Sequence, residues 1–204
     1  MAQDLQVAVV DDDEAVLDSL RLLLEAEGFA VATFDCARAF LRHCQDHPCA
    51  CLVTDVRMPD MDGLELIEAL KSHGPLPEIV VVTGHGDVPM AVRAMKLGAR
   101  DFLEKPFDPD RMIASVVDAL RAPASQAAIN PDVVSRLETL TPREREVLEQ
   151  LVLGRSNKGI ARELGISPRT VEVHRARVME KMDAESLSQL VRMAFRAGID
   201  PGAG

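Results

Sequence analysis

Four short apolar runs in the first half of the chain each end in polar side chains that suit phosphate chemistry. Those side chains are Asp11 with Asp12, then Asp55, Thr83 and Lys105. Because the carboxyl ends of strands in an open parallel α/β sheet meet at one crevice, the pattern predicts that these groups share a pocket. Carboxylates, a lysine and a hydroxyl are the groups that a magnesium ion and a transferred phosphoryl group require. The chain is therefore expected to carry a phosphoryl-accepting site.

Asp55 is the predicted phosphoryl acceptor, because it ends a strand and precedes a loop, residues 56–63, that can leave it exposed. A carboxylate is a competent nucleophile toward an activated phosphoryl donor and forms an aspartyl phosphate. Asp11 and Asp12 are expected to hold Mg2+ (or Mn2+), together with Asp55 and the backbone carbonyl of Arg57.

Lys105 and Thr83 complete the predicted site. Lys105 would bring positive charge to the phosphoryl oxygens, and the Thr83 hydroxyl would bond one of them after transfer. Each feature taken alone has a more ordinary explanation. An acidic pair after a strand commonly caps a helix, here with Asp13 and Glu14, while a threonine or a Lys-Pro pair commonly lies in a turn or loop. Joint placement at successive strand ends is what favours the site.

The elements that must position these groups extend from residue 5 to about residue 121. In this region β-type runs alternate five times with helical periodicity. This order predicts a doubly wound, five-stranded parallel sheet of the flavodoxin-like kind. We assign residues 1–121 to this α/β domain, residues 122–136 to a linker whose ends can be helical, and residues 137–204 to a small all-α domain.

Charge is distributed unevenly along the chain. The net charge is −10, with −11 in residues 1–123 and +1 in residues 124–204. Residues 155–181 hold seven basic side chains against three acidic ones. A basic segment inside an acidic protein indicates a local contact with a polyanion.

Two classes of feature are not expected. No apolar run approaches the roughly 18 residues of a membrane span, and residues 1–6 lack the pattern of a signal peptide, so a cytoplasmic location without a membrane partner is expected. The cysteines lack paired C-x-x-C spacing, which favours buried or half-buried thiols over a metal or redox cluster. They are Cys36, Cys44, Cys49 and Cys51.

Helix start and stop signals mark the C-terminal region. Thr141 and Glu144 form a capping box with a proline at the first helical position, and Ser156 can cap the next helix. Gly165 then makes a turn, Ser167 begins a third helix, and Ser186 begins a fourth that ends near Gly198. A short helix, a glycine turn and a second helix form the helix-turn-helix arrangement.

The helix after Ser167 has two predicted faces. At 100° per residue, one side carries an inward stripe, formed by Val171, His174, Val178 and Met182. On the opposite side Val173 and Ala176 can touch a thymine methyl group, and Glu172 can accept from a cytosine amino group. Other polar residues are expected to contact phosphates, namely Lys158, Arg169, Thr170, Arg175, Arg177 and Lys181. A solvated helix face is the ordinary alternative for the arginines.

Several segments resemble known families. VVDDDE, VTDVRMPDMDG, VVVTGHGD and DFLEKPFD resemble the signatures of the bacterial response-regulator receiver domain over residues 5–121, and TGHGDVPMAVRAMKLGA resembles its FixJ-type branch. Residues 137–199 resemble the LuxR-type DNA-binding domain. The likeness implies that Thr83 and Phe102 are switch residues, with Phe102 in place of the commoner tyrosine, and that the bond before Pro106 is cis.

The resemblance also implies how the parts act together. A sensor histidine kinase would phosphorylate Asp55, and the switched receiver would form a homodimer and bind promoter DNA as a transcriptional regulator. RNA polymerase is a further candidate partner. The dimer contact is expected at the apolar start of the fourth helix, where ordinary core packing is the alternative. Its residues are Val88, Pro89, Met90 and Val92.

The sequence leaves three other functions to consider. A phosphohydrolase that uses Asp55 is disfavoured because Arg57 stands where related phosphatases place a second carboxylate. A phosphorelay carrier without DNA output is disfavoured by residues 137–199. A ligand-sensing regulator of the quorum type would share only the C-terminal half. Its N-terminal domain would not need Asp11, Asp12, Asp55 and Lys105 at one site.

Overall fold

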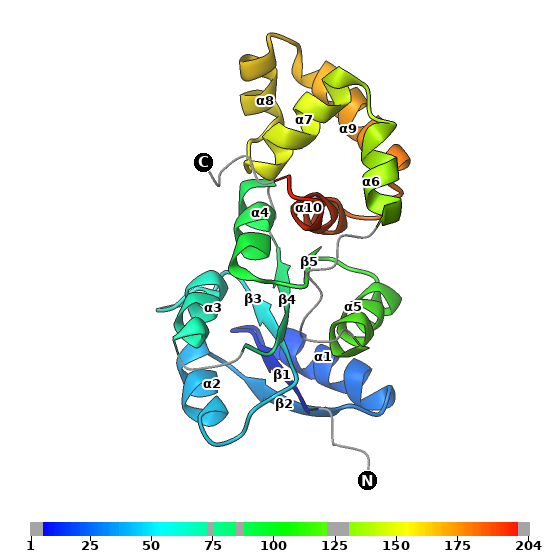
Figure 1. The fold of residues 1–204 in the computed structure, drawn as a ribbon. Coiled ribbons are helices and arrows are strands. Elements are labelled where there is room, and N and C mark those ends of the chain that lie inside the picture. Colours follow the sequence, from blue (N-terminus) through cyan, green and yellow to red (C-terminus); the bar gives the residue numbers. More distant parts are fainter. Residues whose placement is uncertain (1–5, 73–75, 85–87, 122–130, 200–204) are drawn as a thin grey trace. The chain divides into compact units, whose positions relative to one another are not determined.

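The computed structural model describes residues 6–72, 76–84, 88–121 and 131–199 (Figure 1). A five-stranded parallel sheet lies at the centre of the N-terminal part. Its strands are β1 (Gln6–Val10), β2 (Ala30–Phe34), β3 (Cys51–Asp55), β4 (Glu78–Thr83) and β5 (Asp101–Glu104). They lie in the order β2-β1-β3-β4-β5. The order reverses between β1 and β3, which places a ligand-binding crevice at the carboxyl ends of these strands. The predicted fold class of this half is confirmed.

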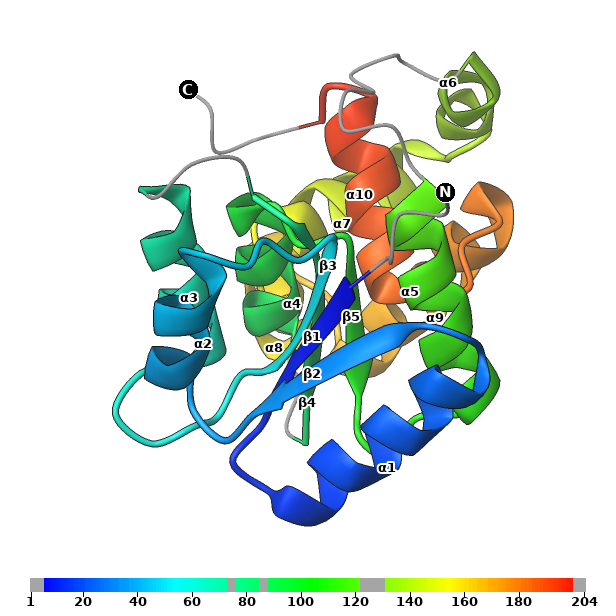
Figure 2. The same ribbon diagram turned by 90° about the horizontal axis from the view of Figure 1, so that it is seen from below.

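Helices cover both faces of the sheet. Figure 2 shows α1 (Glu14–Ala26) and α5 (Pro109–Arg121) on one face, with α2 (Ala37–Cys44) and α3 (Gly63–Lys71) on the other. Every residue of β3 is buried, and so is every residue of β4 after its first. Central strands of a parallel sheet are covered on both sides, so their sequences are continuous apolar runs that end in polar residues at the crevice.

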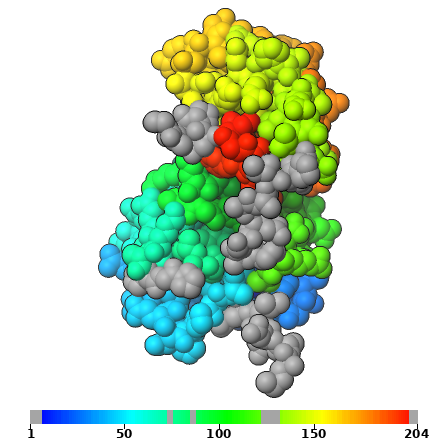
Figure 3. Space-filling model, viewed as in Figure 1, coloured from blue at the N-terminus to red at the C-terminus, as the bar shows by residue number. Residues whose placement is uncertain are grey.

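The remaining described elements are helical. They are α4 (Val88–Leu97), between β4 and β5, then α6 (Pro131–Glu138), α7 (Pro142–Val152), α8 (Asn157–Leu164), α9 (Pro168–Met182) and α10 (Leu187–Arg196). The residues form two compact units, one built on the sheet and the other comprising α6 to α10 with most of α4. In the space-filling view α6, α7 and α10 reach the surface of the helical unit (Figure 3).

The helix starts in the second unit occur where the sequence predicts them. Thr141, Ser156 and Ser167 each accept a hydrogen bond from the backbone N–H three residues further on. Gly165 ends α8 in the left-handed region at φ 65°, a conformation that glycine adopts without a steric penalty. The short turn from α8 to α9 is therefore fixed by a serine cap and a glycine.

Helix α6 lies mostly within the segment predicted as linker. Its Val133 and Leu137 are buried in the same core as Val147 of α7 and Val178 of α9. This core gives the helical unit one more helix than the four that the start signals of the sequence indicate. Residues 122–130 of the predicted linker lie outside the described residues.

The described residues also bear on the expectations about membrane spans and cysteines. None of their helices has the length and apolar character needed to cross a membrane. Cys51 is buried in β3, and Cys36, Cys44 and Cys49 are half-buried thiols without a disulfide. Burial raises the pKa of the Cys49 thiol to about 11, helped by the nearby Cys44, so this thiol stays protonated at neutral pH. The prediction of buried or half-buried thiols is confirmed.

Candidate phosphoryl-accepting site and DNA-binding face

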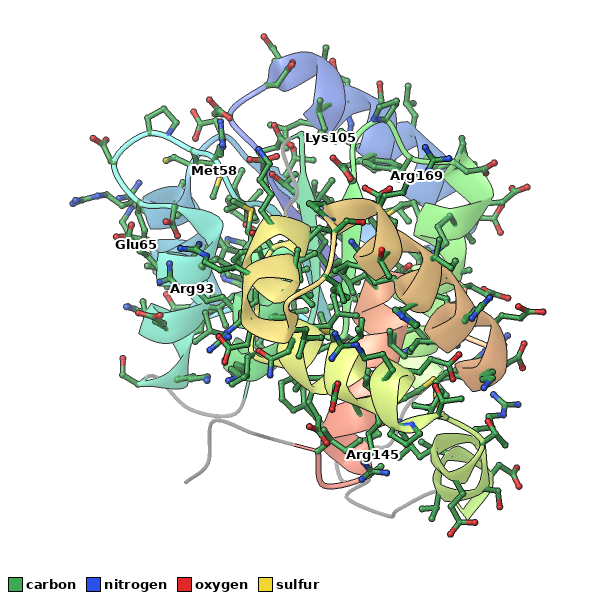
Figure 4. All side chains as sticks on the ribbon, turned by 90° about the horizontal axis from the view of Figure 1, so that it is seen from above. Met58, Glu65, Arg93, Lys105, Arg145 and Arg169 are labelled. Carbon is green, nitrogen blue, oxygen red and sulfur yellow. The ribbon has the colours of Figure 1, made fainter. Side chains whose placement is uncertain are left out.

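Asp11, Asp55 and Lys105 meet at the carboxyl ends of β1, β3 and β5. Lys105 Nζ donates to Asp11 Oδ2 at 2.6 Å and to Asp55 Oδ1 at 2.8 Å. Asp11 is 2% exposed and Asp55 5% exposed, so both carboxylates are buried beside one ammonium group. The expectation that the loop after β3 leaves Asp55 exposed is therefore wrong, because residues 56–63 fold back over the strand end. Figure 4 labels Lys105 at this edge of the sheet. The strand ends therefore bring together three of the groups that the sequence singled out.

The backbone around Asp55 is held by the loop that follows it. The Arg57 amide donates to Asp55 Oδ2 at 2.5 Å, so each carboxylate oxygen of Asp55 has its own donor. The Val56 amide donates to Val82 O of β4, and the Gly63 amide returns to Val56 O at 2.9 Å. These bonds fold the loop back over the end of β3 and fix the direction of the Asp55 side chain.

The local environment acts on Asp55 in opposite directions. Burial raises the pKa of its carboxyl group above the ordinary value, while the bonds from Lys105 and the Arg57 amide lower it and leave a net increase. Burial lowers the pKa of Lys105, but its bonds to Asp11 and Asp55 outweigh that effect and the pKa is raised. Lys105 therefore stays charged at neutral pH, and its bond to Asp55 favours the ionised form of that carboxyl group.

A divalent cation was expected between the acidic residues. In the described residues no three His, Cys, Asp or Glu side chains form a metal-ligand cluster. Asp11 and Asp55 converge on a cationic ammonium group, which shows that their oxygens face a space where positive charge is favoured. Asp12, unlike these two, is exposed. The donor set of two carboxylates fits a hard cation that keeps several waters, as Mg2+ does.

The predicted switch residues are Thr83, the last residue of β4, and Phe102, the second residue of β5. Thr83 is fully buried, and its carbonyl oxygen accepts from the Lys105 amide at 2.7 Å. Phe102 is half-buried, and its amide donates to the Asp101 carboxylate at 2.9 Å. The peptide bond between Lys105 and Pro106 is cis, as the resemblance implied. Thr83 and Lys105 are thus joined directly through the backbone.

The inner stripe of α9 is found where the helical period places it. Val171, Val178 and Met182 are fully buried, and His174 is half-buried. Arg169 in the first turn of α9 is labelled in Figure 4. Most of the other predicted DNA contacts are exposed, namely Lys158, Arg169, Glu172, Val173, Ala176 and Arg177. Val173 is a large apolar residue left 46% exposed, which suits contact with a thymine methyl group.

Two cations assigned to phosphates are engaged within the helical unit. Arg175 Nη1 donates to Asn157 Oδ1 of α8 at 2.6 Å, and burial lowers the pKa of the guanidinium. Lys181 Nζ donates to Glu144 Oε2 at 2.7 Å and to Thr139 O at 2.9 Å. Asn157 was not singled out from the sequence, because an asparagine after a capping serine carries no distinctive signal. Thr170 is half-buried, and its hydroxyl bonds that of Ser167.

Comparison with known proteins identifies both halves. Residues 7–117 match the model of the response regulator receiver domain. Residues 138–194 match that of bacterial regulatory proteins of the luxR family. The chain is 54% identical over 197 residues to the transcriptional regulatory protein FixJ of Bradyrhizobium diazoefficiens, covering 95% of this chain and 96% of that protein. This chain belongs to the FixJ-type response regulators.

Other relatives agree with this assignment. FixJ of Rhizobium meliloti is 50% identical, with 97% of this chain and 98% of that protein covered. The response regulator TodT of Pseudomonas putida is 42% identical, with 93% and 85% covered. Among solved structures, full-length FixJ from B. japonicum matches with a TM-score of 0.55 and 53% identity over 96% of this chain and 98% of that chain.

Membership in this family decides between the functions considered from the sequence. A FixJ-type response regulator is a transcription factor with a receiver domain and a LuxR-type DNA-binding domain, and not an enzyme. The receiver domain implies a histidine kinase as partner, and the helix-turn-helix domain implies DNA. The phosphohydrolase and the carrier without DNA output are thereby excluded.

Proposed function

We propose that a sensor histidine kinase phosphorylates this response regulator on Asp55, and that phosphorylation turns on promoter binding by α9. The observation that carries the proposal is the Lys105 ammonium bridging Asp11 and Asp55 at 2.6 and 2.8 Å. A buried acceptor carboxylate with a fixed cation beside it is the arrangement that phosphoryl transfer by positioning and charge neutralisation requires.

Each residue of the site would have its own role in phosphoryl transfer. One oxygen of the Asp55 carboxylate attacks phosphorus, an oxygen–phosphorus bond forms, and the nitrogen–phosphorus bond of the phosphohistidine breaks with the imidazole as leaving group. Lys105 stabilises negative charge on the phosphoryl oxygens, and the Arg57 amide holds the second oxygen of Asp55. Mg2+, held by Asp11, Asp12, Asp55 and the Arg57 carbonyl, would supply further charge neutralisation; Mn2+ could replace it.

A hollow next to Lys105 suits the docking of the kinase. It has a volume of about 470 Å³ and lies between α1 and the segment after β5. Its lining is largely apolar, with Val16, Leu20 and Leu23 on one side and Pro106 and Phe107 on the other. An apolar surface that adjoins the acceptor would hold the donor histidine in position for in-line transfer.

Phosphorylation would act through Thr83 at the end of β4 and Phe102 in β5. The phosphoryl group adds roughly −1.5 to −2 charges to the pocket. Thr83 would move toward its oxygens and Phe102 would fill the space that Thr83 leaves, which would shift α4 and β5. We propose that the start of α4 then becomes the contact of a homodimer, through Val88, Pro89, Met90 and Val92. Pro89 is the exposed member of this set.

The dimer would present two copies of α9 to an inverted repeat. Glu172, Val173 and Ala176 would read base edges, and Lys158, Arg169, Thr170 and Arg177 would contact the backbone. RNA polymerase is a proposed further partner, and the cytoplasm is the proposed location.

Light scattering coupled to size exclusion tests this scheme. The protein is measured with Mg2+ before and after treatment with a small phosphodonor, beside the Asp55→Asn variant. We expect the wild type to shift from monomer to dimer and the variant to stay monomeric. Identical dimerisation and identical promoter binding by the two proteins after treatment would overturn the role of Asp55.

A further inference from the structure

The C-terminal end of α9 is fastened to the segment that joins α6 to α7. Lys181 Nζ, on the last turn of α9, bonds Glu144 Oε2 at 2.7 Å and Thr139 O at 2.9 Å. These two acceptors come from the first turn of α7 and from the residues just before it. One ammonium group therefore ties the recognition helix to the start of α7.

A second cation holds the same end of the helix. Arg136 Nη1, from α6, donates to the carbonyl oxygen of Met182 at 2.9 Å, and Arg136 Nη2 lies 3.0 Å from the Asp183 carboxylate. The last carbonyl groups of a helix have no partner within the helix, and cations near them are favoured by the helix dipole. The end of α9 is thus held at two points by neighbouring elements.

Glu144 is the anchor of this arrangement. It is 2% exposed, and its Oε2 also accepts from the Thr141 amide at 2.9 Å as part of the capping box. The bonds from Lys181 and from Thr141 lower the pKa of the Glu144 carboxyl group to about 2. A buried carboxylate that loses its cation is strongly disfavoured, so Lys181 is held at this position.

The helical period places Lys181 at the border between the inward stripe and the exposed face of α9. With 100° per residue, Lys181 lies about 120° around α9 from Arg169 and about 20° from His174. His174 belongs to the inward stripe, and Arg169 is exposed. Lys181 also lies about 40° from the exposed Arg177, so its direction is set by its bonds to Glu144 and Thr139, which hold the ammonium group against the start of α7.

We infer that the Glu144–Lys181 ion pair positions the recognition helix, and that Lys181 does not contact a DNA phosphate. By fixing the end of α9 against α7, the pair sets the tilt at which Glu172 and Val173 enter the major groove. The inference rests on the proposed use of α9 to bind DNA and changes the role that the sequence assigned to Lys181.

The salt dependence of DNA binding separates a positioning residue from a phosphate contact. The test uses the full-length, phosphodonor-treated protein and a fixed mixed-sequence DNA duplex. The variants are Lys181→Met, Glu144→Gln, the double variant carrying both changes, and Lys158→Met as a control at an exposed lysine. Loss of one phosphate contact lowers the slope of log K against log salt by about 1. We expect that loss for Lys158→Met and an unchanged slope for Lys181→Met.

The sign of the affinity change gives a second readout. Charge alone predicts that Lys181→Met weakens binding and that Glu144→Gln, which removes a negative charge, strengthens it. A positioning role predicts that each single change weakens DNA binding by about tenfold. It also predicts that the loss of binding free energy in the double variant is smaller than the sum of the two single losses. Circular dichroism at the assay temperature confirms that each variant is fully folded, so that reduced stability does not account for the effect. If Glu144→Gln does not fold, the salt slopes of Lys181→Met and Lys158→Met alone distinguish positioning from phosphate contact.

Each outcome has one meaning. Equal loss of slope in Lys181→Met and Lys158→Met, or stronger binding by Glu144→Gln, would overturn the inference and leave DNA binding by α9 intact. Failure of the wild type to bind the duplex at low salt would instead overturn the proposed function, and the positioning role with it.

Discussion

The backbone of Gly63 lies so close to Asp55 that a Cβ atom on Gly63 would overlap the carbonyl oxygen of Asp55. The same Cβ would stand 3.1 Å from the Thr54 hydroxyl. This close approach is possible because the Gly63 amide turns back to Val56 O. The first residue of α3 therefore sets the position of the backbone that carries Asp55, the proposed phosphoryl acceptor.

Gly63→Ala is expected to block phosphorylation. The new methyl group must displace the backbone of Asp55, which moves the carboxylate from the Arg57 amide and from Lys105, and overpacking of this kind costs about 1–3 kcal/mol of stability. Phosphoryl incorporation from a small phosphodonor and urea unfolding measure the two effects. Gly159→Ala, where a Cβ meets neighbours no nearer than 3.6 Å, is the matched control and should be neutral or stabilising. Normal phosphorylation of Gly63→Ala would show that the acceptor tolerates this displacement.

Lys105→Met is expected to slow phosphoryl transfer by about a hundredfold, because a fixed charge beside the transferred group is lost. It should also raise the pKa of Asp55 further, since the bonds from Lys105 are among the effects that lower it. The measurement is the initial rate of phosphoryl incorporation against pH, and the acid limb of the profile should move to higher pH in the variant. Lys71→Met, on the exposed end of α3, should match the wild type. A wild-type rate and profile for Lys105→Met would exclude the assigned role.

The parts of the site that could be predicted from sequence are those marked by neighbouring residues in the chain. The ends of β1, β3 and β5 carry Asp11, Asp55 and Lys105 directly after buried apolar runs, and topology alone brings such ends together. The bond from Lys105 to both carboxylates could not be predicted, because it depends on the path of the chain after β5. Gly63 appeared from sequence only as the end of a loop.

In the recognition helix α9, too, features set by nearby sequence could be predicted and contacts with other helices could not. The inward stripe of Val171, Val178 and Met182 follows from the helical period and is fully buried. The sequence predicts phosphate contacts for Lys181 and Arg175, because basic residues on such a helix commonly make them. Their partners Glu144 and Asn157 lie on other helices, and pairing across helices is set by packing angles that a single sequence does not reveal.

Glu144→Gln is expected to destabilise the helical unit in a pH-dependent way. The pKa of Glu144 is lowered in the folded protein to about 2, so its contribution is fully present above the unfolded pKa of about 4.3 and is lost as the pH falls toward 2. The difference in unfolding free energy between wild type and variant should be about 2 kcal/mol near pH 6 and should vanish at the acid end. Urea unfolding of both proteins at a series of pH values measures it. A difference independent of pH would mean that the charge of Glu144 does not stabilise the fold.

Arg169→Met and Val173→Ala should affect DNA binding in different ways, although both residues are exposed on α9. Arg169 is a proposed phosphate contact, so its loss should weaken binding to all duplexes alike and lower the salt slope by about 1. Val173 is a proposed base contact, and its truncation should leave the slope unchanged while relaxing preference at one position of a selected operator by roughly 1 kcal/mol. Selection from a random duplex pool with wild type and each variant gives the preferences, and titration at several salt concentrations gives the slopes. If Val173→Ala selects the same operator with the same stringency as the wild type, Val173 does not read a base, and specificity must come from Glu172, from Ala176 or from the shape of the DNA.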